Sequence, residues 1–232
     1  MNALLLAGGY GKRLRPITDS VPKCLVKING KPLLEHWLEL LNHEAIKKII
    51  INTHYLSEMV TEFIQKSKYK KKIILAYEEK LLGTGGTILR NKEYFKDDLF
   101  FVAHADNFCK FSITDLLKYQ KKNIKKKCDI TMLTFKCSNP SNCGIIKHND
   151  FILSEYVEKP ISSDNNIANA AIYLFNKNVI TYLENLKIYK PDISKHVIPY
   201  FIGRTLIYNK LISNIDIGTK KNFNYVNKYE IF

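Results

Sequence analysis

The sequence is poor in the features that mark membrane proteins, disulfide-rich proteins and zinc proteins. No apolar run approaches the roughly 18 to 20 residues that a membrane-spanning helix needs. The five cysteines are an odd number and include no Cys-x-x-Cys pair, which argues against a disulfide framework and a zinc site. Met1 leads directly into an apolar run, so no signal peptide is expected. We therefore expect a cytoplasmic protein with free thiols and no membrane partner.

The composition is that of a folded protein. With 232 residues, of which 46% are apolar and 12% aromatic, the chain can bury a core of its own and is not expected to be disordered. No internal repeat and no linker divides the chain. We therefore expect a single domain over residues 1–232.

The formal net charge of +14 raises the alternative of a nucleic-acid-binding protein, which would bind any oligonucleotide in a salt-sensitive way. The densest lysine runs lie in residues 66–72 and 121–127. Both follow predicted helices and precede predicted strands, where cations favour the C-terminal end of the helix and stay solvated. No known nucleic-acid motif accompanies them, so we expect no nucleic-acid partner.

The first thirty residues hold the most specific pattern in the chain. The run Ala3–Ala7 is typical of a buried strand, and it opens into the glycine loop Gly8–Gly11, whose missing side chains allow the backbone to approach a ligand closely. Lys12, Arg13 and Lys23 follow and favour an anionic ligand with several phosphates. We interpret this stretch as a triphosphate cradle formed by Leu6, Ala7, Gly8, Gly9, Gly11, Lys12, Arg13 and Lys23.

Two better-known phosphate loops do not fit this stretch. A P-loop requires Gly-Lys-Ser/Thr, whereas Gly11-Lys12 is followed by Arg13. The dinucleotide fingerprint Gly-x-Gly-x-x-Gly has Leu14 in its third glycine position, and the next predicted strand ends at Thr53 without the acid that would hold a ribose. A glycine-rich turn with a solvated basic flank is the structural alternative.

Strand-like and helical patterns alternate after this loop. Residues 48–53 and 72–77 have strand patterns. Apolar spacing predicts helices over 32–45, from Ser57 onward, over 178–184 and over 194–201. Such alternation predicts an α/β protein with a Rossmann-like three-layer fold and a mostly parallel central sheet. Ligands of such sheets bind beyond the carboxyl ends of the strands, where the glycine loop lies.

The string LLLAGGYGKRLRPITDSVPKCLVKINGKPLLEHWLELL resembles the N-terminal signature of the sugar-1-phosphate nucleotidyltransferases. These enzymes couple a nucleoside triphosphate to a sugar 1-phosphate and release pyrophosphate. The resemblance covers nearly the whole chain, from about residue 2 to residue 219. The residues that it implies for holding the triphosphate are Gly8, Gly9, Gly11, Arg13 and Lys23.

A second glycine-rich segment, Gly83-Thr84-Gly85-Gly86, opens a predicted helix shortly after Glu78. It resembles the base-recognition segment of the family and implies nucleotide contacts by Glu78, Gly83 and Thr84. A carboxylate accepts two donors, as the ring N–H and amino group of guanine offer, whereas uracil and thymine offer one N–H. We therefore expect GTP. A glycine turn with surface acids is the structural alternative.

Asp106 and Asp216 each follow or end a predicted strand, so the fold can bring them together at one rim. The resemblance implies that they are metal ligands and that they form the catalytic set with Arg13 and Lys23. Carboxylate oxygens completed by water and phosphates suit Mg²⁺. His104 and Ala105 precede Asp106 where the family has Asn-Gly or Gly-Gly, so we expect sugar contacts near His104 to differ from those of common members.

Three later segments resemble the sugar-binding segments of the family. They imply that Gly144 meets the sugar through its backbone, that Glu158 takes hydroxyls and that Lys159 takes the sugar phosphate. Asn169 is the fourth expected sugar contact, and it begins Asn-Ala-Ala-Ile-Tyr where the family has Asn-Ala-Gly-Ile-Tyr. The extra methyl of Ala171 is expected to narrow the sugar pocket. A surface ion pair is the structural alternative for Glu158 and Lys159.

The sequence thus predicts a Mg²⁺-dependent guanylyltransferase for a mannose-type or heptose-type sugar 1-phosphate, a monomer or homodimer that would serve nucleotide-sugar and polysaccharide biosynthesis. One alternative is a uridylyl-, thymidylyl- or cytidylyltransferase of the same fold, acting on another sugar phosphate or on a non-sugar phosphate. Another is a nucleotide-sugar sensor without catalysis. A sensor should have lost a metal carboxylate, whereas this chain keeps both candidates.

Overall fold

The computed structural model describes residues 1–210 and 213–228, so the predicted domain 1–232 includes positions outside the described part. The chain divides into two compact units. Unit 1 comprises Met1–Leu81, Ala103–Lys110 and the segment that begins at Ser213, and unit 2 comprises Leu82–Val102 and the segment that begins at Phe111. Neither unit is one continuous stretch of chain. The single domain expected from the sequence stays a prediction.

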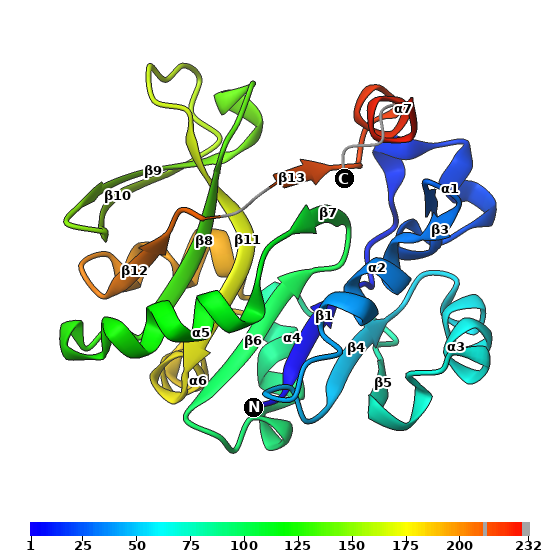
Figure 1. Cartoon of the computed structure of the whole chain (residues 1–232), viewed down its shortest axis with the longest axis horizontal. Helices are drawn as coiled ribbons and strands as arrows, with labels where there is room; N and C mark the ends of the chain where they lie inside the picture. The colour runs from blue at the N-terminus through cyan, green and yellow to red at the C-terminus, as the bar shows by residue number, and fades with distance from the viewer. Residues whose placement is uncertain (211–212, 229–232) are drawn as a thin grey trace. The chain divides into compact units, whose positions relative to one another are not determined.

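Unit 1 is built on three parallel strands in the order β5, β4, β1 (Figure 1). β1 (Ala3–Leu6) pairs with β4 (Ile49–Thr53), and β4 pairs with β5 (Ile73–Tyr77). Every residue of β4 is buried, as expected of a parallel strand that is covered on both faces. α2 (Leu33–Leu40) and α3 (Ser57–Lys66) connect these strands and form the crossovers that the alternation predicted.

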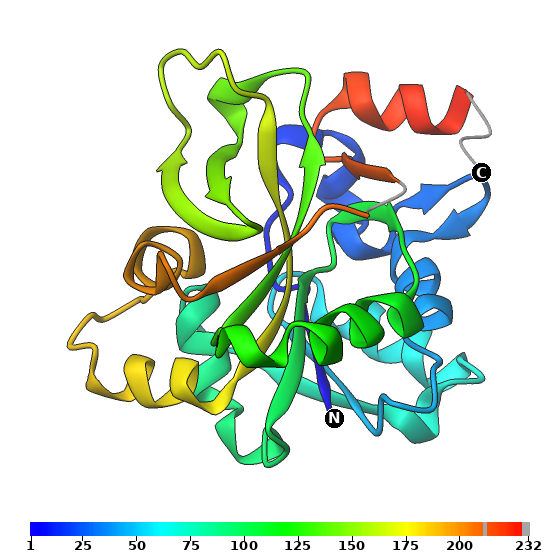
Figure 2. The same cartoon turned by 60° about the vertical axis from the view of Figure 1, so that its left-hand side comes forward.

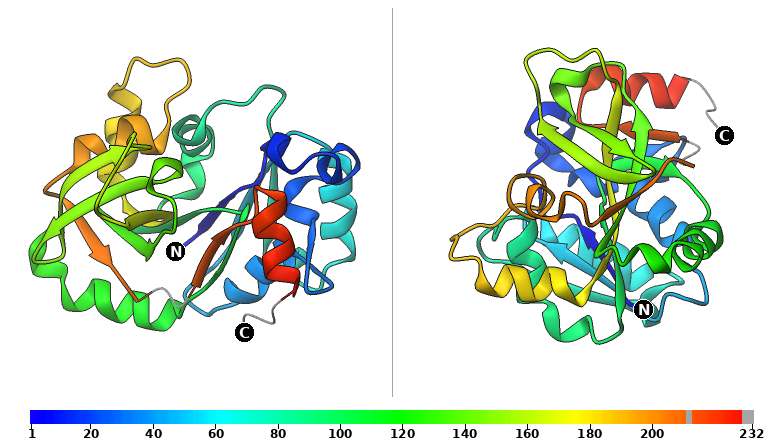
Figure 3. Two further views of the ribbon diagram at one scale, coloured as in Figure 1. Left: turned by 90° about the horizontal axis from the view of Figure 1, so that it is seen from above. Right: turned by 90° about the vertical axis from the view of Figure 1, so that its left-hand side faces the viewer.

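Smaller elements complete unit 1. They are α1 (Ile17–Ser20), β2 (Lys27–Ile28), β3 (Lys31–Pro32), β7 (Asn107–Lys110), β13 (Ser213–Asp216) and α7 (Lys220–Lys228), the last drawn red in Figure 3. β13 pairs antiparallel with β7, which places Asp216 opposite Asn107. The N–H of Ala105 donates to Leu6 O at 3.0 Å. Asp106 and Asp216 are therefore both held near the carboxyl end of β1.

The strands of unit 2 follow the order β11, β8, β12, β10, β9 (Figure 2). They are β8 (Ile130–Lys136), β9 (Gly144–Asn149), β10 (Ile152–Glu158), β11 (Ile167–Asn176) and β12 (Thr205–Tyr208). β12 pairs parallel with β8, whereas the other pairings of unit 2 are antiparallel. The β9–β10 pair is antiparallel because a direct turn joins the two strands into a hairpin. The helices are α4 (Thr84–Arg90), α5 (Ile113–Lys122) and α6 (Lys177–Asn185). β6 (Leu99–His104) starts in unit 2 and ends in unit 1.

The α/β class with a Rossmann-like fold is confirmed. The strands of unit 1 pair in parallel as predicted, whereas most pairings of unit 2 are antiparallel. Ser112 caps α5, since its hydroxyl accepts from the Asp115 N–H at 3.1 Å. Both lysine runs lie at helix ends before a strand, as predicted. No helix of the described residues is long and apolar enough to cross a membrane.

Two helix predictions were wrong in extent. The helix expected over 32–45 ends at Leu40, because Asn42 and His43 form a turn in which the Ala45 N–H donates to His43 Nδ1 at 3.1 Å. The helix expected over 194–201 is split into two short turns, Ile193–Val197 and Pro199–Phe201. Pro199 lacks the N–H that would continue the helix.

Candidate functional site

The glycine loop leaves the end of β1 and is fixed by side chains of unit 1. The Ala7 N–H donates to Asn52 Oδ1 at 2.7 Å, which holds the start of the loop beside β4. Gly11 has a φ of 65°, and a Cβ there would lie 2.9 Å from Thr18 Cγ2, so only glycine fits. The Thr18 hydroxyl donates to Gly11 O at 2.8 Å. A Cβ at Gly9 would meet nothing within 4 Å, so the loop is open on that side.

A hydrogen-bond chain connects this loop to Glu78. Tyr10 OH lies 2.9 Å from His54 Nε2, and His54 Nδ1 lies 2.8 Å from the backbone O of Glu78. Because a carbonyl oxygen only accepts, His54 carries its proton on Nδ1, and Nε2 accepts from the Tyr10 hydroxyl. Glu78 itself follows β5 and is 4% exposed. The residue expected to read the base is thus held next to the triphosphate loop, within unit 1.

Lys23 lies between the two carboxylates that the sequence predicted as metal ligands. Its Nζ donates to Asp106 Oδ2 at 2.8 Å and to Asp216 Oδ1 at 3.1 Å. Arg13 Nη2 donates to the other oxygen of Asp216, Oδ2, at 3.0 Å. The Lys23 side chain is only 8% exposed, whereas that of Arg13 is 63% exposed. The structure therefore brings all four predicted catalytic residues together. Lys12 stays apart from them, exposed over the Tyr10 ring.

The absence of a side chain at Gly218 is part of this cluster. A Cβ at Gly218 would lie 2.7 Å from Asp216 Oδ1, 2.8 Å from Arg13 Nη2 and 2.9 Å from Lys23 Nζ. The Gly218 N–H also donates to Asp216 Oδ1 at 2.7 Å. The sequence analysis missed this residue, although a glycine two positions after a predicted metal ligand was a usable signal.

The charge balance of the cluster keeps Asp106 ionised. Desolvation works to raise the pKa of the Asp106 carboxyl, but the Lys23 ammonium, with His104 and Arg13, holds that pKa below its ordinary value.

The cluster also meets the requirements of a Mg²⁺ site. In the described ranges 1–210 and 213–228, no group of three or more His, Cys, Asp and Glu side chains could hold a metal ion. Mg²⁺ does not need such a group, because it binds through one or two carboxylates and keeps water and substrate phosphates in its other positions. Asp106 and Asp216 already share one cation, the Lys23 ammonium. The donor set therefore fits Mg²⁺.

In unit 2, the glycines at the start of α4 are used for internal packing. The N–H groups of Gly85 and Gly86 both donate to Pro191 O, at 2.9 and 3.3 Å. Gly83 has a φ of 79°, and a Cβ there would lie 2.7 Å from the same oxygen. Pro191 thus caps α4 where we expected a ligand. The contact of Gly83 with a nucleotide stays a prediction.

The Thr84 hydroxyl is also bonded within unit 2, to Asp192 and Ile193. It accepts from the Ile193 N–H at 2.7 Å and donates to Asp192 Oδ2 at 3.1 Å. Asp192 Oδ1 in turn accepts from the Lys195 N–H at 3.1 Å. The turn that begins at Ile193 is therefore tied to the start of α4, and a nucleotide contact by Thr84 stays a prediction.

Glu158, the expected sugar contact, ends β10 and is held by Tyr156. The Tyr156 hydroxyl donates to Glu158 Oε2 at 2.5 Å. The Tyr156 ring fills the space beside Gly144, where a Cβ would lie 2.7 Å from Tyr156 Cζ. Gly144 and Glu158 are register partners in the β9–β10 hairpin. The missing side chain of Gly144 thus makes room for the residue that positions Glu158, while its own contact with a sugar stays a prediction.

Lys159 follows Glu158 with an unusual backbone. Its φ is 50°, and its N–H donates to Cys143 O at 2.9 Å. Lys159 Nζ lies 3.8 Å from Glu158 Oε1, and the Lys159 side chain is 63% exposed. The ammonium is therefore accessible for a phosphate, as its predicted role requires.

Asn169 shapes a bulge in β11. Its Nδ2 donates to the Tyr173 hydroxyl at 2.8 Å, and its Oδ1 accepts from the Ala171 N–H at 2.9 Å. The pairing of β11 with β8 shifts register between Asn169 and Tyr173. Ala171 has a φ of 55°, which an alanine adopts at a cost and a glycine does not. A glycine at this position, as in the family motif, would adopt that φ without strain, and the narrowing of the sugar pocket by the Ala171 methyl stays a prediction.

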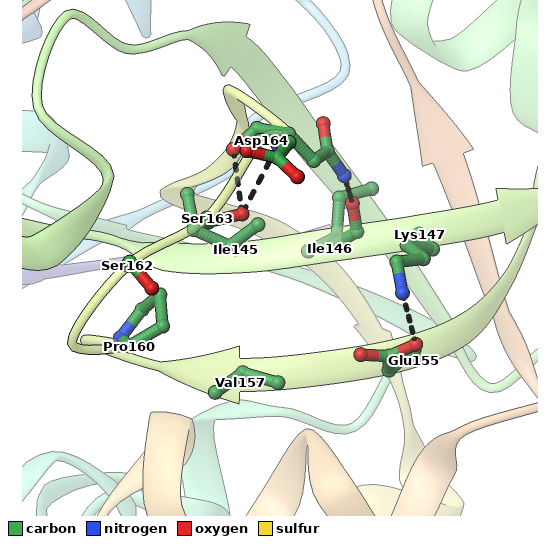
Figure 4. A pocket seen from close by; sticks show the side chains of 10 residues that line it. Ile145, Ile146, Lys147, Glu155, Val157, Pro160, Ser162, Ser163 and Asp164 are labelled. Carbon is green, nitrogen blue, oxygen red and sulfur yellow. Dashed lines mark hydrogen bonds and ion pairs between the residues drawn. The ribbon is translucent and has the colours of Figure 1, made fainter.

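A cavity of about 530 Å³ lies on the opposite face of the β9–β10 hairpin (Figure 4). Ile145, Lys147, Glu155 and Val157 line it, and they alternate along the strands with Gly144, Tyr156 and Glu158. Lys147 Nζ donates to Glu155 Oε2 at 2.7 Å within it. This cavity is therefore separate from the Glu158 site.

A family model and two curated relatives bear on this site. Residues 2–230 match the family model described as nucleotidyl transferase. The mannose-1-phosphate guanyltransferase of Yarrowia lipolytica is 32% identical over 231 residues, which cover 96% of this chain and 62% of that protein. The mannose-1-phosphate guanylyltransferase catalytic subunit beta of Danio rerio is 31% identical with the same coverage. This chain thus spans 62% of the length of these relatives.

A solved structure gives the same fold. HddC from Yersinia pseudotuberculosis, crystallised with GMP-PN, matches with a TM-score of 0.79 and 25% identity, and the match covers 98% of both chains. A second crystal structure of HddC from Yersinia pseudotuberculosis matches with a TM-score of 0.80.

Proposed function

Because this chain belongs to the nucleotidyl transferase family, we propose that it transfers the nucleotidyl group of GTP to a sugar 1-phosphate, giving a GDP-sugar and pyrophosphate. The observation that carries this proposal is the Lys23 ammonium, which lies within hydrogen-bond distance of both Asp106 and Asp216. A cation held by two carboxylates at the end of a parallel strand, beside an open glycine loop, can neutralise the charge that phosphoryl transfer develops on the phosphates.

The reaction needs alignment and charge neutralisation rather than a base. A phosphate monoester dianion is a competent nucleophile, so an oxygen of the sugar 1-phosphate forms the new bond to the α-phosphorus. The bond from the α-phosphorus to the bridging oxygen breaks, and its electron pair leaves with pyrophosphate. Charge on the phosphates is neutralised by Arg13 and Lys23, and positioning supplies much of the remaining acceleration. Lys159 is assigned to the phosphate of the sugar.

Lys23 is suited to a phosphate because of its donor count. An ammonium carries three N–H donors, and among the described residues two are taken by Asp106 and Asp216. The third is left for a phosphate oxygen. When bound, Mg²⁺ would be held by these two carboxylates and would neutralise phosphate charge.

Guanine and a mannose-type sugar are the proposed specificities. Glu78 is a buried carboxylate next to the triphosphate loop, and a carboxylate pairs with the two donors of guanine. The names of the relatives from Yarrowia lipolytica and Danio rerio, and the GMP-PN complex of HddC, support both the base and the sugar class. A heptose 1-phosphate is the alternative acceptor.

Pyrophosphate release tests the proposal. The protein is incubated with each of GTP, dTTP, UTP and CTP, with Mg²⁺ or with EDTA, and with a panel of sugar 1-phosphates that includes mannose, glucose and heptose forms. We expect release that needs GTP, Mg²⁺ and one manno-configured acceptor. Release with another triphosphate would overturn the role of Glu78 but keep the reaction. No release with any pair would overturn the function.

A further inference from the structure

β5 is the outermost strand of unit 1, and in the described part of the chain it pairs only with β4 (Figure 1). Just after β5, the Glu78 N–H donates to Thr53 O at 2.8 Å. Successive residues of a strand turn their backbone N–H and C=O groups to opposite edges, so every second residue before Glu78 also bonds to β4. The other residues of β5 turn these groups away from the sheet, and they are Ile73, Leu75 and Tyr77. β5 thus presents an edge to which another strand can be added.

The side chains along this edge are apolar and only partly covered. Leu75 is half-buried, and Tyr77 is 60% exposed. Both line a cavity of about 450 Å³, together with residues of α3 that include Glu58 and Glu62. Edge strands of monomeric proteins are commonly protected by a proline, a charged residue or a bulge, and β5 contains none of these. The edge therefore has the character of a strand that pairs with a partner.

Charged residues of opposite sign flank β5. Lys71 precedes the strand and Glu79 follows it, each four positions from Leu75, and both side chains are exposed. When two copies of β5 run antiparallel about a twofold axis at Leu75, Lys71 of each copy comes opposite Glu79 of the other, which is a stabilising pair. A parallel pairing would place like charges side by side. Lys70 and Lys80, one position further out, are exposed and can turn into solvent.

The same register also pairs the backbone groups. Leu75 lies opposite Leu75 of the second copy, and Ile73 lies opposite Tyr77. Each residue with outward N–H and C=O groups thus meets another such residue, and in an antiparallel ladder these residues exchange both hydrogen bonds. Opposite residues share one face of the sheet, so the Tyr77 ring contacts the β-branched Ile73 of the other copy, a favourable cross-strand pair.

We propose that β5 is the interface of a symmetric homodimer, in which it pairs antiparallel with β5 of a second copy of this chain. The parallel strands of the two copies of unit 1 then form one continuous sheet. Because both copies use the same edge, the assembly closes at two and leaves no open β5 edge. The proposal does not rest on the proposed function, since neither the interface nor its test involves a substrate.

Charge exchange tests both the interface and its register. Sedimentation velocity of the whole chain, over a range of protein concentrations, gives the Kd of the dimer. Lys71→Glu and Glu79→Lys are each expected to raise this Kd about tenfold or more, because each puts two like-charge pairs into the interface. An equimolar mixture of the two variants has opposite charges in both pairs, and its Kd should return to within about threefold of the wild-type value.

Lys122→Glu is the matched control, because it makes the same charge change on α5 of unit 2, at another exposed lysine. Its Kd should equal that of the wild type. A wild-type protein that stays monomeric at every concentration would overturn the proposal. A dimer that neither charge variant weakens, or one that the mixture does not restore, would overturn it equally, because its contacts would involve another surface or register.

Hydrogen exchange of the wild-type protein gives a second readout, which needs no variant. The β5 peptide should exchange its outward amide protons about tenfold more slowly at a protein concentration where the dimer predominates than at one where the monomer does. The β4 peptide is the control, since all its residues are buried and both its neighbours, β1 and β5, belong to the same chain. Its exchange should not differ between the two concentrations. Equal exchange of the β5 peptide at both concentrations would overturn the proposal.

Discussion

A Cβ atom at Gly218 would lie 2.9 Å from Lys23 Nζ, so the ammonium that joins Asp106 and Asp216 occupies the space that a side chain at position 218 would need. Gly218 is not in the left-handed region, and its backbone would accept an alanine. The atoms in the way are the far ends of the Lys23 and Arg13 side chains, which can move. A methyl group at position 218 is therefore expected to displace the side chains of the cluster and to leave the backbone fold unchanged.

Gly218→Ala is expected to lower kcat more than about tenfold while the free energy of unfolding falls by only about 1 kcal/mol. Steady-state pyrophosphate release and thermal unfolding measure the two quantities. Gly9→Ala is the control for stability, because a Cβ there meets nothing within 4 Å. A variant with wild-type turnover would contradict the close packing of the cluster.

Removing one charge from the carboxylate pair should stop the reaction and leave the fold intact. Asp106→Asn and Asp216→Asn are each expected to lower kcat by about 100-fold or more, because a carboxylate that balances the cations and that we propose as a Mg²⁺ ligand becomes neutral. Circular dichroism checks that the fold is kept, and pyrophosphate release at several Mg²⁺ concentrations checks the metal role.

Asp19→Asn is the matched control for these variants. Asp19 pairs with Arg15 at 3.0 Å on the surface of unit 1, where both side chains are about half exposed. Its loss should change neither turnover nor Mg²⁺ dependence measurably, since exposed pairs contribute little. If Asp106→Asn and Asp216→Asn behaved like Asp19→Asn, the metal assignment would be wrong.

The backbone of Ala171 predicts a stabilising substitution. Its φ of 55° is costly for alanine, and glycine adopts it freely. Ala171→Gly is therefore expected to raise the free energy of unfolding by about 1 kcal/mol and the melting temperature by about 2–4 °C, after the greater flexibility of glycine in the unfolded chain is subtracted. Ala168→Gly, at a fully buried position of the same strand, should instead lower the melting temperature. Equal effects at the two positions would contradict the strain at Ala171.

The sequence could predict the parts of this protein that depend on local pattern. Alternating strand and helix periodicity located β1, β4, β5 and the helices between them, and the glycine loop after β1 followed from its composition. That Asp106 and Asp216 meet was predictable because both lie at strand ends on one rim. The shared partner, Lys23, was singled out by its charge.

The remaining features of the fold and of the site depend on tertiary contacts, which the spacing of residues along the sequence does not reveal. The Tyr156 ring fills the space beside Gly144, and nothing in the local sequence of either residue indicates that contact. The antiparallel hairpin of β9 and β10 was not predicted, because its segments were interpreted only through their resemblance to sugar-binding motifs. Gly83 and Thr84 were expected to contact a nucleotide, since sequence alone cannot show that Pro191 O lies against Gly83 or that the Ile193 N–H donates to the Thr84 hydroxyl.

His36 predicts an acid-sensitive contribution to stability. Burial lowers the pKa of His36, although the backbone O of Ile28, to which Nε2 donates at 3.1 Å, opposes that shift. The ring also packs edge-on against Phe108. The unfolded chain therefore takes up a proton at a higher pH than the folded protein does, and the free energy of unfolding must fall as the pH drops below about 6.5, until the lowered folded-state pKa is reached.

His36→Gln keeps a donor for the Ile28 carbonyl but cannot titrate. Between about pH 6.5 and pH 5, the wild-type free energy of unfolding should fall more steeply than that of the variant, by at most about 1.4 kcal/mol per pH unit for one proton. Urea unfolding at a series of pH values measures both slopes, and the acid response of the carboxylates cancels in their difference. Above pH 7.5 the two curves should run parallel. Parallel curves across the whole range would mean that the neutral form of His36 is not favoured by folding.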